Sequence, residues 1–216
     1  MDKEINVKGG KIYAFFKRAF DIVMSFLAII VLSPILLIIG LLVKLTSKGP
    51  VLFKDNRIGK NGKNIKVLKY RSMYVDAESK IKDYLSEEEY NRWLVERKLD
   101  HDPRITKIGN FIRKTSLDEL PQLFNILKGD MSIVGPRPIT KLELEENFSD
   151  EEKNLLLSCR PGLTGFWQVY GRSNVNYESG ERQKQELEYF NHRSIWFDIK
   201  LILLTVPAVL SKKGAH

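Results

Sequence analysis

Two adjacent carboxylates, Asp118 and Glu119, lie in the stretch TSLDELPQLFNIL at residues 115–127. Ser116 and Glu119 have the spacing of a capping box, in which each side chain satisfies a free backbone amide at the start of a helix. Acidic side chains in a first helical turn also interact favourably with the helix dipole. A pair of carboxylates can equally perform chemistry, as a nucleophile or as a metal ligand. These thirteen residues alone favour capping, and the rest of the chain must decide.

Pro121 limits where this helix can begin. If Ser116 is the cap, Pro121 falls at the fifth helical position, where its missing N–H removes a hydrogen bond. If Asp118 is the cap, Pro121 lies in the first turn, where the amides are free, but the Asp118 side chain is then engaged in capping. Both alternatives stay open from the sequence.

Arginines beside proline or glycine recur on either side of the acidic pair, at Arg104, Arg137 and Arg160. Arg137 lies between Pro136 and Pro138, whose fixed φ angles restrict the loop. A restrained guanidinium loses less entropy on binding and can hold a phosphate through two donors. One Pro-Arg-Pro is usually a surface turn, but several such loops around an acidic pair indicate an anion site.

The composition also points to an anionic partner. The chain has 216 residues and a formal net charge of +8, which suits nucleic acid, acidic lipid headgroups or a phosphorylated substrate. A single cysteine, Cys159, excludes an internal disulfide, and three histidines with one cysteine cannot form a zinc site of Cys and His. The sequence has no Walker A motif and no G-x-G-x-x-G motif.

Residues 22–43 form an apolar segment of 22 residues without a charge. At about 1.5 Å per residue it could span a hydrocarbon core of about 30 Å. The segment is too long for the apolar region of a signal peptide. It predicts a membrane-bound protein.

The flanks and centre of this segment favour a re-entrant anchor. Basic residues lie on both sides: Lys8, Lys11, Lys17, Arg18, Lys44 and Lys48. Because basic flanks favour the cytoplasmic side, a full crossing would place one set on the wrong side. Pro34 clashes with the carbonyl of Ile30, and Ser33 can bond that carbonyl. We therefore expect a helix–break–helix turning at Ser33 and Pro34, with an ordinary kinked span as the alternative.

The remaining chain predicts an α+β, mainly helical fold. Apolar runs at 51–53 and 65–68 around the turn-forming residues 59–64 predict a β-hairpin. Residues 76–100 and 143–158 have the periodicity of amphipathic surface helices, to which we assign no chemistry.

The C-terminal stretch 194–210 is apolar but short, and it is interrupted by charges and a proline. It is expected to lie along the membrane interface or to pack on the membrane segment. The expected organisation is a basic N-terminus with a re-entrant anchor at 1–48 and a catalytic domain on the membrane surface at 49–216.

Together, these motifs resemble those of the small monotopic phosphoglycosyl transferases, the bacterial sugar transferases that start polysaccharide and glycoprotein glycan assembly. The matching stretches are Ser33-Pro34 in its basic-flanked segment, KYRSM at 69–73, DPRIT at 102–106, SLDELPQLFNILKGDMSIVGPRP at 116–138 and RPGLTGFWQVYGR at 160–172. The resemblance covers roughly residues 17–205, and the long block from Asp118 to Pro138 is its most specific part. The form expected is the minimal one, without a multi-span N-terminal half.

The resemblance implies transfer of a sugar-1-phosphate from a UDP-sugar to polyprenyl (undecaprenyl) phosphate, with release of UMP. It implies Mg²⁺ as the cofactor, with Mn²⁺ as a substitute, and a location on the cytoplasmic face of the bacterial inner membrane. Two polyanionic substrates, one of them a lipid, would account for the positive charge and the membrane segment together.

The resemblance also assigns roles to individual residues. Asp118 becomes the nucleophile, forming a phosphosugar-aspartyl intermediate, and a metal ligand, while Glu119 assists the second half-reaction or shares the metal. Arg113 and Arg137 become phosphate or nucleotide clamps. Weaker substrate-binding candidates are Lys69, Arg71, Arg172 and Asp198. Asp198 could assist the metal or the polyprenyl phosphate, or simply pair with Lys200.

A rival interpretation is a non-catalytic, membrane-bound basic module that recruits partner proteins or acidic lipids. It explains the charge and the anchor, but not an acidic pair among arginine-rich loops. Nucleic acid is not expected as a partner, because no aromatic-basic platform stands out. The expected partners are the UDP-sugar, polyprenyl phosphate, membrane lipids and downstream glycosyltransferases. A homodimer, the sugar and the glycan pathway stay open.

Overall fold

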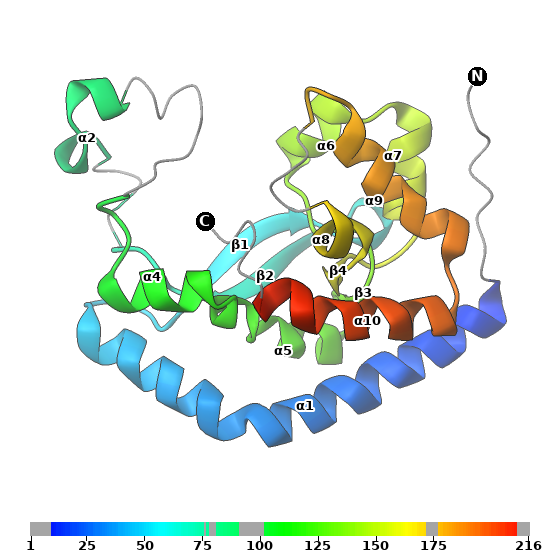
Figure 1. Ribbon diagram of the computed structural model, residues 1–216, viewed down its shortest axis with the longest axis horizontal. Helices are drawn as coiled ribbons and strands as arrows, with labels where there is room; N and C mark the ends of the chain where they lie inside the picture. The colour runs from blue at the N-terminus through cyan, green and yellow to red at the C-terminus, as the bar shows by residue number, and fades with distance from the viewer. Residues whose placement is uncertain (1–9, 76, 78–80, 91–101, 172–176, 211–216) are drawn as a thin grey trace.

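The computed structural model describes residues 10–75, 77, 81–90, 102–171 and 177–210. Its elements are mainly helical, with two small two-stranded sheets (Figure 1). In chain order they are α1 Lys11–Thr46, β1 Leu52–Ile58, η1 Lys60–Gly62, β2 Asn64–Tyr70, α2 Ile81–Tyr84, α4 Lys107–Lys114, η2 Leu117–Glu119, α5 Gln122–Lys128, β3 Ser132–Val134, α6 Lys141–Asn147, α7 Asp150–Leu157, β4 Gly162–Thr164, α8 Phe166–Tyr170, α9 Glu181–His192 and α10 Ile195–Leu210. The predicted fold class, α+β and mainly helical, is confirmed.

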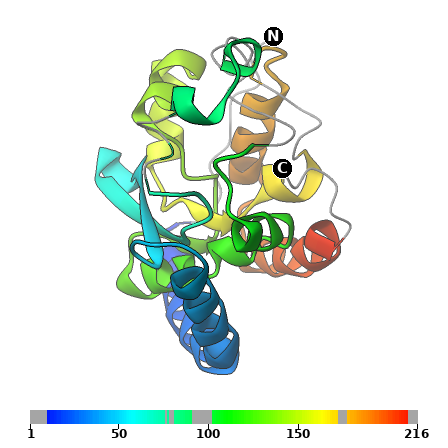
Figure 2. The ribbon, with the colours of Figure 1, turned by 90° about the vertical axis from the view of Figure 1, so that its left-hand side faces the viewer.

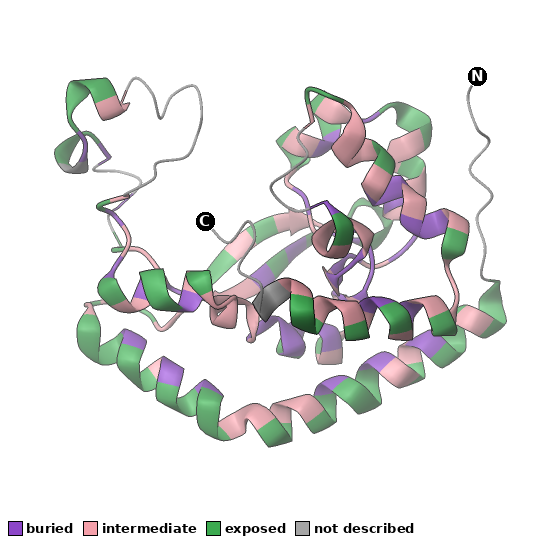
Figure 3. Cartoon of the chain, viewed as in Figure 1, coloured by how far each residue is buried: buried purple, intermediate pink, exposed green. Residues whose placement is uncertain are grey.

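Helix α1 lies along one side of the molecule, as two perpendicular views show (Figures 1 and 2). Its inner side packs Leu36, Ile39 and Val43 against the rest of the chain, whereas its outer side is exposed and largely apolar (Figure 3). By length and composition, α1 could cross a membrane. A contiguous apolar face of this size is not left in water by a soluble domain, so it indicates a membrane-embedded surface.

The expected break at Ser33 and Pro34 is not present, because α1 is one continuous helix of 36 residues. Pro34 cannot donate to the carbonyl of Ile30, but the Ser33 hydroxyl donates to it instead at 2.8 Å. This substitute bond explains why the helix continues through the proline. Figure 1 shows that α1 is nevertheless bent near its middle, as expected where a proline interrupts the hydrogen-bond ladder.

The predicted β-hairpin is confirmed. Strands β1 and β2 pair antiparallel from Leu52 opposite Tyr70 to Ile58 opposite Asn64. The hairpin is fastened to the membrane helix at one end, where the Tyr70 hydroxyl donates to the carbonyl of Leu36 at 2.7 Å.

A second sheet was not predicted. It pairs β3 with β4 in parallel, and each strand has only three residues, too few to show a period-two pattern. The two backbones approach so closely that a Cβ at Gly162 would lie 2.2 Å from the amide nitrogen of Gly135. Glycine is therefore required at this crossing.

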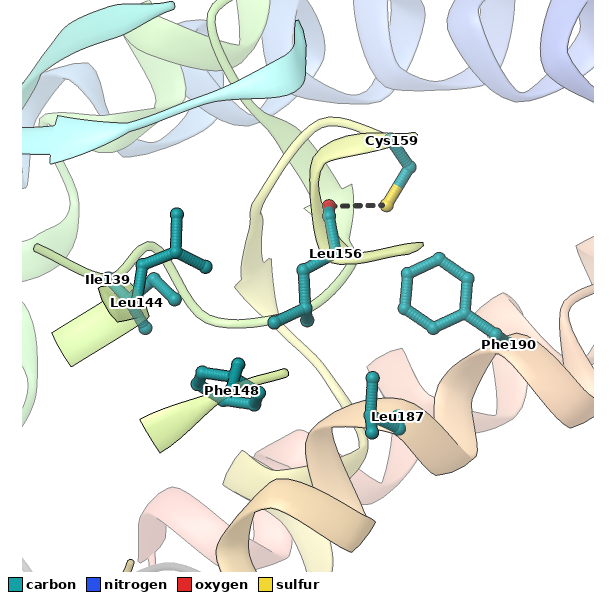
Figure 4. Packing of buried hydrophobic residues seen from close by; sticks show 7 residues of the cluster. All are labelled: Ile139, Leu144, Phe148, Leu156, Cys159, Leu187 and Phe190. Atoms are coloured by element: carbon teal, nitrogen blue, oxygen red, sulfur yellow. Dashed lines mark hydrogen bonds between the residues drawn. The ribbon is translucent and has the colours of Figure 1, made fainter. Parts of the chain in front are cut away.

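The stretch 143–158 contains part of α6 and all of α7, and each of these helices begins with a capping box. With α9 they enclose a hydrophobic core that includes Leu144, Phe148, Leu156, Leu187 and Phe190 (Figure 4). Within the predicted helical stretch 76–100, the structure contains the short helix α2, and residues 91–100 lie outside the described residues.

The C-terminal stretch forms helix α10, which packs against α8 and the β3–β4 sheet with Leu201 fully buried. Near its start, Asp198 pairs with Lys17 of α1 at 2.8 Å, which confirms packing on the membrane segment. Trp196, Leu203 and Val206 are exposed. Their position at a membrane interface stays a prediction.

Candidate active site

The acidic pair lies in a turn, not in a capped helix. Ser116 has φ 56° and ψ 17°, the left-handed conformation, and its side chain makes no capping hydrogen bond. Leu117–Glu119 form a 3₁₀ turn, and Pro121 is the N-cap of α5. Both predicted caps are therefore wrong. A non-glycine residue held in this conformation costs about 1–3 kcal/mol, and such strain concentrates at functional sites.

Helix α5 holds this turn against both the hairpin and the membrane helix. The buried Asn125 amide donates to the carbonyl of Lys66 and accepts from the amide of Leu68, both at 2.8 Å. At the other end, Arg18 of α1 donates to the carbonyls of Ile126 and Leu127 at 2.7 and 3.0 Å. The carbonyl of Leu127 is one that the helix C-terminus leaves without a backbone donor, whereas that of Ile126 also accepts from the amide of Gly129 at 3.0 Å.

Helix α4 brings Arg113 to the same place. Thr106 caps the helix by accepting from the amide of Gly109 at 2.9 Å. Gly109 lies so close to the end of the hairpin that a Cβ there would be 1.9 Å from the carbonyl oxygen of Ser72. This close approach fixes α4 beside β2, with Arg113 in its last turn.

A cavity of about 360 Å³ lies between these elements. It combines charged side chains with apolar ones, and is lined by Pro50, Leu52, Phe53, Asp55, Lys69, Tyr70, Arg71, Ser72, Met73, Tyr74, Val75, Ala77, Arg113 and Asp118. Its size falls within the range of about 300–1,000 Å³ that is usual for small-molecule sites. Four of the predicted site residues line it: Lys69, Arg71, Arg113 and Asp118.

Asp118 is largely buried, and its carboxylate forms no ion pair within the described part of the chain. Burial raises the pKa of Asp118 to about 6, and the neighbouring charge of Glu119 adds to this, while Lys69 and Arg113 oppose it. Glu119 is more exposed and lies 3.8 Å from the ammonium of Lys69, which is also 3.7 Å from Asp55. The site is an acidic pair facing two cations.

Arg71 borders the cavity, but its donors are engaged. Its guanidinium donates to the carbonyls of Pro50 at 2.6 Å and Ser47 at 3.0 Å, and to the Ser47 hydroxyl at 2.6 Å. These contacts fasten the chain after α1 to the end of β2. A role for Arg71 in binding phosphate stays a prediction.

Arg137 is not among the described residues that line the cavity. Its amide donates to the buried Glu186 at 2.9 Å, and its guanidinium lies 3.4 Å from Glu143. Arg182 lies over the rings of Trp167 and Tyr177, at 4.4 and 4.1 Å. Sequence reasoning missed this cluster, because the polar sequence of α9 resembles a solvated helix.

Asp198 is likewise not a lining residue of the cavity within the described chain. It is only 2% exposed, and its carboxylate accepts from Lys17 and the Tyr13 hydroxyl at 2.8 Å and from the Tyr189 hydroxyl at 3.0 Å. Its ion-pair partner is Lys17, not the Lys200 considered from the sequence. Arg172 lies outside the described residues.

These features define a protein with an apolar anchoring helix and a cation-rich pocket built around a partly buried aspartate. Residues 12–212 match the family model described as bacterial sugar transferase. The chain belongs to this family, and the resemblance found in its motifs is confirmed.

Named relatives agree with this assignment. The chain is 41% identical over 202 residues to the exopolysaccharide production protein ExoY of Sinorhizobium fredii, covering 93% of the chain and 88% of the relative. It is 44% identical over 205 residues to the undecaprenyl-phosphate galactose phosphotransferase of Salmonella typhimurium, covering 94% of the chain and 42% of the relative. It is 42% identical over 204 residues to the UDP-glucose:undecaprenyl-phosphate glucose-1-phosphate transferase of Escherichia coli, covering 93% and 41%. The chain thus spans about two fifths of the length of the last two relatives.

Proposed function

We propose that this protein transfers a sugar-1-phosphate from a UDP-sugar to undecaprenyl phosphate and releases UMP. The observation that carries the proposal is the largely buried Asp118, which has no ion pair among the described residues and faces Lys69 and Arg113 in a ligand-sized cavity. The names of the relatives from Salmonella typhimurium and Escherichia coli support the same reaction class. Membership of the bacterial sugar transferase family supports it further.

The first half-reaction is a displacement at the sugar-bearing phosphorus. An oxygen of Asp118 attacks this phosphorus, the bond to the bridging oxygen breaks, and UMP leaves with that oxygen. Because the pKa of Asp118 is about 6, the carboxylate is mostly charged and nucleophilic above neutral pH. Lys69 and Arg113 offset the charge of the phosphates.

In the second half-reaction, an oxygen of undecaprenyl phosphate attacks the same phosphorus. The bond to Asp118 then breaks, which restores the carboxylate and gives the lipid-linked product. Glu119 is suited to orient or deprotonate the incoming phosphate, since it is exposed and adjacent to Asp118.

The residues present fit Mg²⁺, for which Mn²⁺ could substitute. Among the described residues, no three His, Cys, Asp or Glu side chains form a metal site by themselves. Mg²⁺, however, usually binds through one or two carboxylates together with substrate phosphates. Asp118, with or without Glu119, would hold it, and the ion would neutralise phosphate charge. Burial is the main cause of the raised pKa of Asp118, and repulsion from Glu119 adds to it; a bound cation would relieve that repulsion.

The test is release of UMP by the purified protein with Mg²⁺, undecaprenyl phosphate and a panel of UDP-sugars. Glucose, galactose and N-acetylated amino sugars belong in the panel, and a lipid-linked sugar product is expected with at least one of them. Absence of UMP with every sugar would favour the rival function, a non-catalytic basic module.

We further propose that α1 enters and leaves the membrane on the cytoplasmic face of the inner membrane. Its bend, its exposed apolar face and the basic residues on both flanks support this topology. In a Cys159→Ser background, Lys8→Cys and Lys48→Cys should both resist an impermeant thiol reagent in intact cells and react after permeabilisation. Replacing Ser33-Pro34 with Ala-Leu should expose residue 8 outside. Labelling of Lys8→Cys in intact cells without that replacement would mean that the helix crosses.

A further inference from the structure

A second, smaller cavity of about 40 Å³ lies where the N-terminal half of α1 meets the β1–β2 turn, the β3–β4 sheet and the end of α9. It shares no described lining residue with the cavity at Asp118. Five cationic residues from these separate parts of the chain border it: Lys17, Arg18, Lys60, Arg160 and Arg193. Like charges held this close repel each other unless an anion lies between them.

The surrounding carboxylates do not neutralise this cluster. Asp21 is the one acidic residue among the described lining residues, and it already accepts from the Ser132 hydroxyl at 2.8 Å and the Ile133 amide at 3.0 Å. Asp198, behind the cavity, pairs with Lys17. Two carboxylates against five cations leave a net positive charge.

The free donors are also in excess. Arg18 and Arg160 donate to backbone carbonyls, which carry no formal charge. The buried Nε of Arg193 has no hydrogen-bond acceptor among the described residues. Lys60 is exposed and forms no ion pair with a described residue. A buried donor without a partner is rare in folded proteins, and an unfilled anion site explains the one at Arg193.

The same end of the molecule carries large exposed apolar side chains. Ile12, Phe15 and Phe16 of α1 are 76%, 71% and 59% exposed, and Trp196, in the first turn of α10, is 81% exposed. The Lys17–Asp198 pair joins these two helices. Apolar and tryptophan side chains beside cations are typical of the boundary between lipid headgroups and acyl chains.

We propose that this cavity binds the phosphate of an anionic membrane lipid. A space of about 40 Å³ can take a headgroup phosphate but cannot enclose a nucleotide, given the far larger volume of nucleotide-sized pockets. Binding there fastens the N-terminal half of α1 to the headgroup layer, at the opposite end of the helix from Asp118. The proposal does not depend on the reaction proposed above.

The test compares two lysines of the same turn in the full-length protein. Both lysines are exposed; Lys60 borders the cavity, whereas Lys63, three residues further on, is not a lining residue. Thermal unfolding in neutral detergent is followed while dioctanoyl phosphatidylglycerol, dioctanoyl phosphatidylcholine or inorganic phosphate is titrated in. The two lipids have equal chains, so their difference reports the headgroup.

Phosphatidylglycerol should raise the melting temperature of the wild-type protein and of Lys63→Glu at similar concentrations. Lys60→Glu should require an at least about tenfold higher phosphatidylglycerol concentration for the same rise. Each basic residue beside anionic lipid strengthens binding roughly fivefold, and reversing the charge at residue 60 adds repulsion. Equal responses of the two variants, or equal stabilisation by phosphatidylcholine, would overturn the site. Inorganic phosphate acting at the same concentration as phosphatidylglycerol would overturn the lipid assignment.

Discussion

Asp118 and Asp198 are both largely buried aspartates, and they lie toward opposite ends of α1. Asp198 contacts the N-terminal half of the helix, where one lysine and two tyrosine hydroxyls satisfy its carboxylate. Asp118 follows Leu117, which packs near Leu36, Ile39 and Val43 in the C-terminal half, and it has no ion-pair partner in the described chain. The same side chain is thus neutralised at one end and left unneutralised at the other. The second condition favours chemistry and the first favours a fixed structure.

The largest effect is expected from Asp118→Asn, which keeps the size of the side chain and removes the nucleophile. UMP release should fall by at least about a hundredfold. Thermal stability should not fall, because burial already disfavours the charged form of this residue. Glu119→Gln should also be severely impaired. Activity of Asp118→Asn above a few per cent of wild type would remove Asp118 as the nucleophile.

Removal of divalent cations should affect the reaction at Asp118 and leave the ion pair of Asp198 unchanged. UMP release should require Mg²⁺ or Mn²⁺ and vanish with EDTA, because the diphosphate charge must be screened before a carboxylate approaches. The melting temperature without substrate should stay nearly constant, because the described residues contain no cluster of side chains that would hold a structural metal. Full turnover in EDTA would exclude the metal from the mechanism.

At the other end, Asp198→Asn should mainly reduce stability. It leaves the ammonium of Lys17 buried without its counter-charge, which typically costs about 3–5 kcal/mol. The matched control is the double variant Lys17→Met/Asp198→Asn, which removes both charges and should recover much of the loss. Both can be measured by thermal unfolding in detergent.

A stable Asp198→Asn protein without turnover would contradict this structural role. It would instead support the sequence-based prediction that Asp198 assists the metal or the polyprenyl phosphate.

Glu186 is an intermediate case and predicts the smallest effect. One of its oxygens accepts from the amide of Arg137, and the other has no partner among the described residues. Burial raises the pKa of Glu186 to about 7, although this hydrogen bond and the charges of Arg137 and Arg182 oppose it. The folded state therefore keeps a proton that the unfolded state releases near pH 4.5, so stability should decrease as pH rises from about 4.5 to 7.

Glu186→Gln should abolish this pH dependence and be more stable than wild type at pH 8, by about 3 kcal/mol. Melting temperatures recorded from pH 4.5 to 8 measure both effects. An unchanged slope in the variant would show that another group causes it.

The parts of the fold that follow local patterns could be predicted from the sequence. The apolar helix and the hairpin are such cases, because periodicity and turn residues report each of them directly. The start of α5 could not be predicted, since it depends on the left-handed Ser116, which has no sequence signal. The β3–β4 pair was missed because three residues carry no pattern.

For the site, the motifs indicated which residues to examine, and four of them meet at one cavity. They could not indicate how each residue is used. Arg71 donates hydrogen bonds to the backbone carbonyls of Ser47 and Pro50, which no sequence motif indicates. The partner of Asp198 is 181 residues earlier in the chain, so no local pattern could identify it.

That sequence separation has a consequence for biogenesis. The Lys17–Asp198 pair joins the N-terminal half of α1 to α10, so it cannot form until the 181 residues that follow Lys17 have been synthesised. At about 5–20 residues per second, the N-terminal half of α1 waits on the order of ten to forty seconds for its partner. During translation the apolar helix must therefore be held by the membrane or by a chaperone. Only the synthesis of α10 supplies Asp198, the partner that fixes the N-terminal half of α1 to the rest of the protein.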